Sequence, residues 1–147
     1  MKADKERIKF LLYEIKENTL DLEKILKDNS DAEIISNKTT IKVIKYTLIE
    51  LSEGISLVLQ HILSKEYGQP VKGYIDTIKK AADLNIITNS LSQRLKPFFD
   101  FRNSLIHRYW IVENEKLIQN CREGNQDFYR FIEEIEGFME KVLDKNE

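Results

Sequence analysis

Apolar residues recur every three or four positions along most of this chain, which is the spacing of a helix with one buried face. The longest such run begins at Ser30 and Glu33, which have the spacing of a capping box at a helix N-terminus. Its apolar positions are Ile34, Ile41, Ile44, Leu48, Leu51, Ile55, Val58 and Ile62. We expect this helix to fray around residues 37–40, which are weak helix formers, and to end at Gly68, with Pro70 just beyond.

The same spacing predicts four further helices, over residues 8–26, over residues 71–83, from a cap at residues 88–90, and over residues 127–144. Pro97 is expected to kink or restart the fourth of the five helices. The REGN stretch before residue 127 is expected to break the last helical region. No pair of strands is indicated. We therefore predict an all-α, up-and-down bundle of about five helices, with residues 1–147 forming one domain.

The long second helix carries more apolar residues than one packed seam needs. The additional positions are Ile49, Leu57, Leu59 and Leu63. A helix that is apolar on more than one side must be covered on more than one side. The cover comes either from other helices of this chain or from a second copy of it.

Composition excludes several classes of protein. The 147 residues include only 5 Gly and 2 Pro, too few for an all-β fold or a glycine-rich phosphate loop. There is no apolar run of about 18 residues, and the first ten residues are rich in charge, so we expect neither a membrane span nor a secretion signal. The lone Cys121 cannot form an internal disulfide and is expected to be a small buried side chain. We therefore expect a cytoplasmic location.

Metal and cofactor chemistry is not indicated either. The two histidines, His61 and His107, are far apart in the chain, and carboxylates do not cluster in apolar surroundings, so no metal site is expected. His61 is expected to be a structural or surface residue. The sequence implies no cofactor.

Charge is spread unevenly along the chain. The net charge is −2, yet residues 72–110 contain seven basic and three acidic residues. A locally basic segment in an acidic protein favours a confined anion site over a general polyanion-binding surface.

One stretch within this basic segment carries candidate chemistry. Residues 101–110 (FRNSLIHRYW) mix polar and charged side chains with bulky apolar ones. Asn103 and His107 are four residues apart and share a helix face, whereas Arg102 and His107 do not lie on one stripe. Taken alone, these residues could equally be solvated or capping groups near a helix end.

Residues 102–109 (RNSLIHRY) also match an R-x4-H-x-Y pattern, including the polar residue directly after the arginine. The chain thereby resembles HEPN-domain toxins of the HepT type, and its helix layout is similar to theirs. The resemblance implies a metal-independent endoribonuclease that is the toxin of a toxin–antitoxin pair. It further implies an RNA substrate and a minimal nucleotidyltransferase partner that silences the toxin.

The resemblance assigns roles to five residues. Arg102 and His107 would be catalytic, Asn103, Arg108 and Tyr109 would support catalysis or bind substrate, and Tyr109 would be the target of adenylylation by the partner. The residue types suit this chemistry. RNA supplies its own 2′-OH nucleophile, a histidine can exchange protons near neutral pH, and an arginine presents a fork of donors to phosphate. Since the reaction needs both an acid and a base, we expect a homodimer that brings two motifs together.

Two other interpretations remain open from the sequence. The first is a non-catalytic HEPN-like helical module that binds a nucleotide or a partner protein through the same groove. The second is a plain helical adaptor in which Arg102 and Tyr109 only join helices.

Overall fold

The computed structural model describes the backbone of residues 3–108 and 113–146 and, within these ranges, all side chains except those of residues 105–108 and 146. In these ranges the secondary structure is helical, and no strand is present. The α-helices are α1 (Lys5–Asp28), α2 (Asp31–Ile35), α3 (Lys38–Tyr67), α4 (Gly73–Asp83), α5 (Asn89–Arg108) and α6 (Asn114–Phe138). A π-helical turn, Met139–Leu143, and a short 3-10 turn, Asp144–Asn146, extend α6. The predicted all-α, up-and-down bundle is confirmed.

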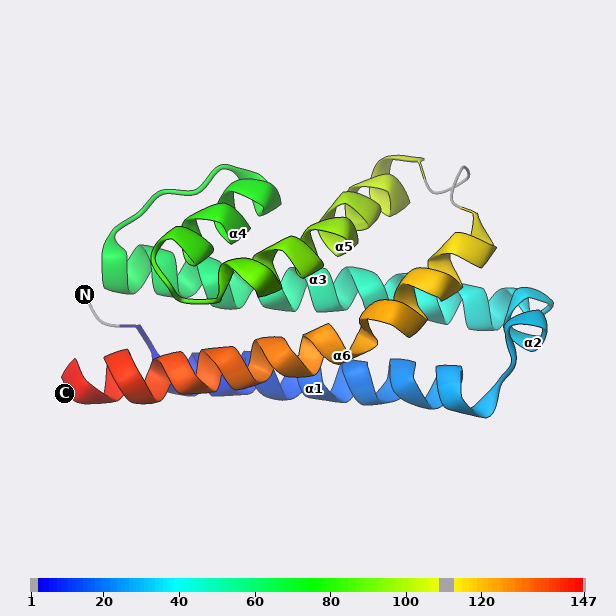
Figure 1. Ribbon diagram of the computed structural model, residues 1–147, viewed down its shortest axis with the longest axis horizontal. Coiled ribbons are helices and arrows are strands. Elements are labelled where there is room, and N and C mark those ends of the chain that lie inside the picture. The colour runs from blue at the N-terminus through cyan, green and yellow to red at the C-terminus, as the bar shows by residue number, and fades with distance from the viewer. Residues whose placement is uncertain (1–2, 109–112, 147) are drawn as a thin grey trace.

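The long helix α3 runs through the middle of the molecule (Figure 1). It packs against α1 on one side and against α4 and α5 on the other, and α6 lies beside α1. Of the additional apolar residues of α3, Leu59 and Leu63 are fully buried and Leu57 is 39% exposed. The chain's own helices therefore provide most of the cover that α3 needs.

The predicted second helix is divided in two. The Ser30–Glu33 capping box is present and opens α2, but α2 ends after five residues. The side chain of Asn37 then accepts hydrogen bonds from the backbone N–H groups of Thr39 and Thr40 and caps α3. Asn is favoured at a helix N-cap because its side chain satisfies such N–H groups. The expected weak point around residues 37–40 is thus a true boundary, and it accounts for the additional helix.

The other end of α3 follows the prediction. Gly68 has a left-handed backbone conformation with φ 60°, and its N–H and that of Gln69 close the helix on the carbonyls of Ser64 and Leu63. Glycine tolerates this conformation because it has no Cβ.

The last two helices are more continuous than predicted. α5 runs through Pro97 without a restart. α6 begins at Asn114, so the expected break at REGN is wrong. Gly124 is the reason: a Cβ built at this position would lie 2.6 Å from Phe98 Cε2, so the absence of a side chain lets α5 and α6 approach closely. A glycine that suggested a helix break is used here for packing.

Arg122 also has a structural role in this segment. Its guanidinium donates hydrogen bonds to the carboxylate of Asp31 at 2.6 Å and to the backbone carbonyls of Leu26 and Asn29 at 2.9 and 3.0 Å. These carbonyls belong to the C-terminal end of α1 and its cap, which have no partners within the helix. Arg122 therefore ties the α1–α2 connection to α6. Across the described ranges, no helix is long and apolar enough to cross a membrane.

Candidate functional site

The five predicted site residues lie at the C-terminal end of α5 and just after it. Arg102 and Asn103 are in α5 with their side chains described. His107 and Arg108 belong to α5, but their side chains lie outside the described part of the chain. Tyr109 lies outside the described residues altogether. The side-chain geometry of the site is therefore described around Arg102 and Asn103.

Arg102 reaches from α5 toward α3 and α4, where its guanidinium is fixed by three side chains. Nη2 donates hydrogen bonds to Glu53 Oε1 at 2.5 Å and to Tyr74 Oη at 2.6 Å. Nη1 donates to Asn103 Oδ1 at 3.2 Å, and Cζ lies 4.0 Å from the centre of the Tyr74 ring. The Tyr74 hydroxyl donates to the same Glu53 oxygen, and the Tyr74 ring stacks on Phe99. We refer to Glu53, Tyr74, Arg102 and Asn103 as the Arg102 cluster.

Most of the donor capacity of Arg102 is already used. A guanidinium carries five N–H groups, of which the cluster engages three. The Nε–H is buried and has no partner among the described atoms. One N–H of Nη1 is left for a ligand, and its direction is fixed because the guanidinium is planar and held from three sides.

The electrostatics of the cluster keep Tyr74 protonated. Burial, followed by the hydrogen bond to Glu53 and that residue's charge, raises the pKa of Tyr74 to about 12, against a smaller opposing effect of Arg102. The Tyr74 hydroxyl is therefore a donor to Glu53 at neutral pH and not a general base. The side chain of Arg102 is 14% exposed and that of Glu53 is 41% exposed, so solvent screens this ion pair from the Glu53 side.

Glu53 and Tyr74 were not identified from the sequence as part of the site. Glu53 lies 49 residues before Arg102 in the sequence, and Tyr74 lies 21 residues after Glu53. No local sequence pattern connects positions that far apart. Cys121 is buried, as expected from the sequence, and burial raises the pKa of its thiol to about 12.

His61 has the structural role expected of it. Its Nε2 accepts a hydrogen bond from the backbone N–H of Asp4 at 2.8 Å, which ties the start of α1 to α3. Among the described residues, no three His, Cys, Asp or Glu side chains are grouped so as to hold a metal ion.

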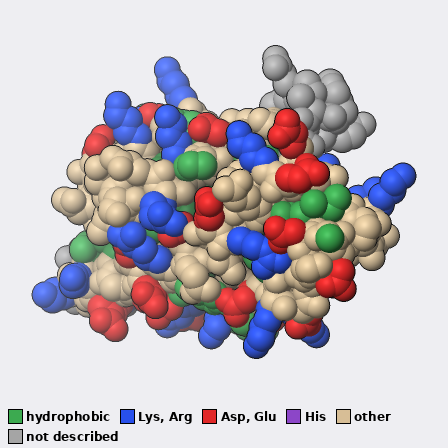
Figure 2. Space-filling view, turned by 45° about the vertical axis from the view of Figure 1, so that its right-hand side comes forward, with side chains coloured by type: hydrophobic (Ala, Val, Ile, Leu, Met, Phe, Trp, Pro, Cys, Tyr) green, Lys and Arg blue, Asp and Glu red, His purple; other side chains and the backbone are tan. Residues whose placement is uncertain are grey.

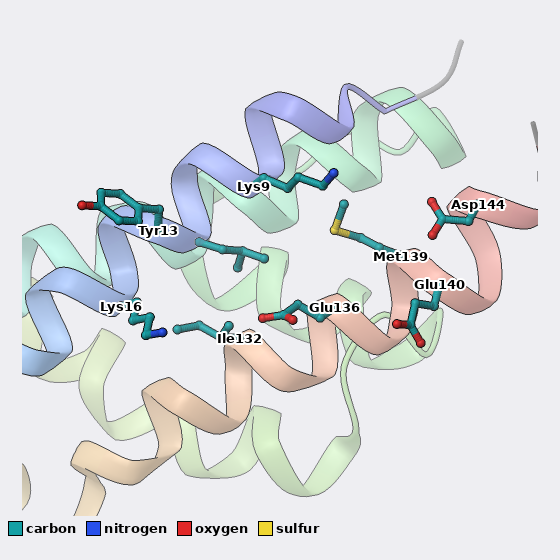
Figure 3. A pocket seen from close by; sticks show the side chains of 9 residues that line it. Lys9, Tyr13, Lys16, Ile132, Glu136, Met139, Glu140 and Asp144 are labelled. Carbon is teal, nitrogen blue, oxygen red and sulfur yellow. The ribbon is translucent and has the colours of Figure 1, made fainter.

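Several grooves lie on the described surface, and two of them differ in their relation to the Arg102 cluster. A groove of about 450 Å³ lies between α1 and the C-terminal half of α6, with Lys9 and Lys16 on one wall and Glu136 and Glu140 on the other (Figure 3). It is formed by helices that take no part in the Arg102 cluster. A second groove, of about 290 Å³, lies between α4 and α5, the two helices that supply Tyr74 and Arg102.

Charged side chains of both signs are intermixed over the face seen in Figure 2. This face has no uniform basic sheet of the kind that binds long polyanions without selectivity. A confined anion site, as the sequence indicated, fits such a surface better.

The structure is a helical bundle in which the arginine of the R-x4-H-x-Y motif is held against the long central helix α3. The chain belongs to the HepT-like ribonuclease family, since the family model described as "Ribonuclease HepT-like" matches residues 15–135. A curated relative named "Putative RNase", from the archaeon Archaeoglobus fulgidus, is 29% identical over 107 residues, which are 71% of this chain and 80% of the relative.

Solved structures share the fold at lower sequence identity. The cytosolic protein of unknown function YutE from Bacillus subtilis superposes with a TM-score of 0.82 at 15% identity, covering 96% of this chain and 94% of that one. A toxin–antitoxin structure with AMP-PNP gives 0.81 at 21% identity, covering 88% and 97%. A mutant of the toxin–antitoxin complex MntA-HpeT gives 0.79 at 20% identity, covering 88% and 98%.

Proposed function

We propose that this protein is a metal-independent endoribonuclease and the toxin of a toxin–antitoxin pair. The observation that carries the proposal is the Arg102 cluster: a guanidinium fixed in direction, with one N–H left for a ligand, in the helix that also carries His107. Membership of the HepT-like ribonuclease family supports it. We propose the cytoplasm as its site of action.

The reaction needs no cofactor to supply a nucleophile, because the 2′-OH of RNA attacks the adjacent phosphorus. His107 takes the 2′-OH proton as the new O–P bond forms, and the bond from phosphorus to the 5′-oxygen breaks as that oxygen takes a proton from the protonated His107 of a second copy. The products are a 2′,3′-cyclic phosphate and a 5′-OH. Arg102 donates to a non-bridging phosphate oxygen and stabilises the added charge of the transition state, with Arg108 near the same phosphate. Asn103 holds Nη1 of Arg102 and could also contact the ribose.

The test is cleavage of RNA by purified protein in EDTA. Wild-type protein should cut and leave 2′,3′-cyclic phosphate ends, and His107→Ala should lower the rate by roughly 10²–10⁴. Arg102→Lys should also be inactive, because a lysine keeps the charge but cannot donate to Glu53, Tyr74 and Asn103 in one plane.

Two results would reject this proposal. Activity abolished by chelation would exclude metal-independent cleavage, as would products with a free 3′-OH and a 5′-phosphate. Absence of cleavage, together with binding of a nucleotide or partner protein that His107→Ala removes, would instead favour the non-catalytic HEPN-like module.

We also propose that a minimal nucleotidyltransferase silences the toxin by adenylylation of Tyr109. A phosphate added to Tyr109, which follows Arg108 in the motif, would occupy the positive charge that RNA needs. Mass spectrometry of the chain co-expressed with the nucleotidyltransferase should show one added AMP on Tyr109. A silenced chain with unmodified Tyr109, or a Tyr109→Phe chain that the partner still silences without binding it stably, would contradict this mode of control.

A further inference from the structure

The groove between α4 and α5 has a basic residue on each wall. Lys79 of α4 and Lys96 of α5 line it, with Ile78 and Ala82 forming its apolar floor. Asn89 and Gln93 of α5 add polar side chains that can donate or accept hydrogen bonds. The volume of about 290 Å³ suits an elongated chain or a small molecule better than a folded domain.

No acidic side chain neutralises the two lysines among the described residues, so their charges can contact an anionic ligand. Lys79 and Lys96 are both exposed, and among the described residues neither forms an ion pair within 4.0 Å. Neighbouring cations differ in this respect, since Lys80 pairs with Asp76 at 3.2 Å and Arg94 pairs with Asp127 at 2.7 Å. The one acidic residue of the groove lining is Asp83, the last residue of α4.

The Arg102 cluster lies beyond one end of the groove, where the same two helices meet. Asn89, Lys96 and Asn103 are seven residues apart in α5, so they lie on one face of that helix at intervals of about 10 Å. On the other wall, α4 begins next to the cluster, because its second residue, Tyr74, contacts Arg102. Asp83 is therefore at the remote end of the groove, and the two lysines lie between it and the cluster.

An exposed apolar side chain lies beside this path. Ile75 is 39% exposed and lines the groove one residue after Tyr74. Apolar and aromatic surfaces beside cations are the usual platform for nucleic-acid bases, which stack on them while the cations contact the phosphates.

From this arrangement we propose that the α4–α5 groove binds the backbone of single-stranded RNA and leads it to the Arg102 cluster, through phosphate contacts to Lys79 and Lys96. This inference rests on the proposed ribonuclease function. It specifies a single strand because packed helices are only about 8–10 Å apart, and the groove between them has no room for a duplex.

The test measures binding in the His107→Ala background, so that the RNA stays intact. Anisotropy of a fluorescent single-stranded oligouridylate is followed between about 50 and 200 mM KCl. Adding Lys79→Ala and Lys96→Ala should weaken binding roughly tenfold at the lower salt concentration, since two phosphate contacts are lost. It should also reduce the slope of log K against log salt by about 1.4, since each phosphate contact to a single strand contributes about 0.7.

The matched control removes the same charge elsewhere. Lys16 and Lys24 are exposed residues of α1, which takes no part in the groove, and Lys16→Ala with Lys24→Ala should leave the salt slope unchanged. Thermal melts of both double variants should match that of their parent, because all four side chains are exposed.

Four outcomes would overturn the inference, and three of them concern RNA: an unchanged slope in the groove variant, an equal loss in the control, or equally tight binding of a duplex of the same length. Loss of binding to the nucleotidyltransferase with RNA binding intact would also overturn it, since the groove would then belong to a protein partner. Cleavage by the chain with His107 is assayed separately. If cleavage is absent while the groove variant still loses RNA binding, the ribonuclease proposal alone fails.

Discussion

Gly124 and Gly137 belong to the same helix, α6, and differ in their surroundings. A Cβ at Gly124 would lie 2.6 Å from Phe98 Cε2, whereas a Cβ at Gly137 would have nothing within 4 Å. Phe98 cannot easily move, because it is buried and its ring packs on Phe128 with centroids 4.8 Å apart. The contact between α5 and α6 therefore depends on the absence of one methyl group.

Alanine should have opposite effects at these two positions. Gly124→Ala should lower the free energy of unfolding by about 1–3 kcal/mol through overpacking. Gly137→Ala should raise it by about 0.5 kcal/mol, since alanine favours the helix over glycine. At roughly 3 °C per kcal/mol, thermal melting can measure both shifts. Equal shifts of the melting temperature in the two variants would show that helix propensity alone determines the effect of alanine.

Contacts between elements hold the beginning of the chain in place. The N–H of Ala3 donates to Glu66 Oε1 at 2.7 Å, and the N–H of Asp4 donates to His61 Nε2 at 2.8 Å, so two residues of α3 fix the entry into α1. The His61 contact requires a neutral imidazole with a free lone pair. Burial, followed by the charge of Arg7, lowers the pKa of His61 below its usual 6.5, while Asp4 opposes this shift.

This lowered pKa predicts how stability changes with pH. Between the folded-state pKa and about 6.5, the unfolded chain binds more protons at this position than the folded chain does. The contribution of His61 is therefore fully present above about pH 6.5 and is lost as the pH falls toward the folded-state pKa.

Denaturant unfolding of wild type and His61→Gln at pH 7.5 and pH 5.5 tests this expectation. Glutamine can still accept from Asp4 but does not titrate, so the variant should lose less stability on acidification. His107 is present in both proteins, so any contribution that it makes to the change in stability cancels when the two are compared. Equal losses would mean that the His61 contact does not contribute to the pH dependence.

At the scale of the whole molecule, one chain offers only one motif histidine, while the proposed reaction needs an acid and a base. Two copies facing each other would supply both, and we expect a homodimer built on the motif-bearing helices. The chain's own helices cover Leu59 and Leu63 of α3, whereas Val43, Tyr46 and Leu57 of the same helix are 43%, 63% and 39% exposed. The expectation of a dimer depends on the chemistry of the reaction.

Light scattering at micromolar concentration should give twice the chain mass of 17.4 kDa. A mass of 17.4 kDa under conditions where the protein cuts RNA would show that one chain suffices and that a second proton donor has to be found within it.

The sequence by itself determined the helical class of the fold, several helix ends, and where the candidate site residues lie along the chain. Apolar spacing, the Ser30 cap and the Gly68 stop are local features, and the structure shows them where expected. The R-x4-H-x-Y pattern placed the site at the end of α5 because its residues are neighbours in the chain. Such features are readable because each depends on interactions over a few residues.

Only the tertiary structure decided which distant residues meet. Glu53, Tyr74 and Arg102 come from three helices, and the Gly124 contact with Phe98 joins two others. The REGN stretch was expected to break a helix because glycine weakens an isolated helix, whereas in the bundle the gain from close packing of α5 on α6 outweighs that cost. Long-range contacts of this kind leave no periodic trace in the sequence, since they depend on how whole helices are placed in space.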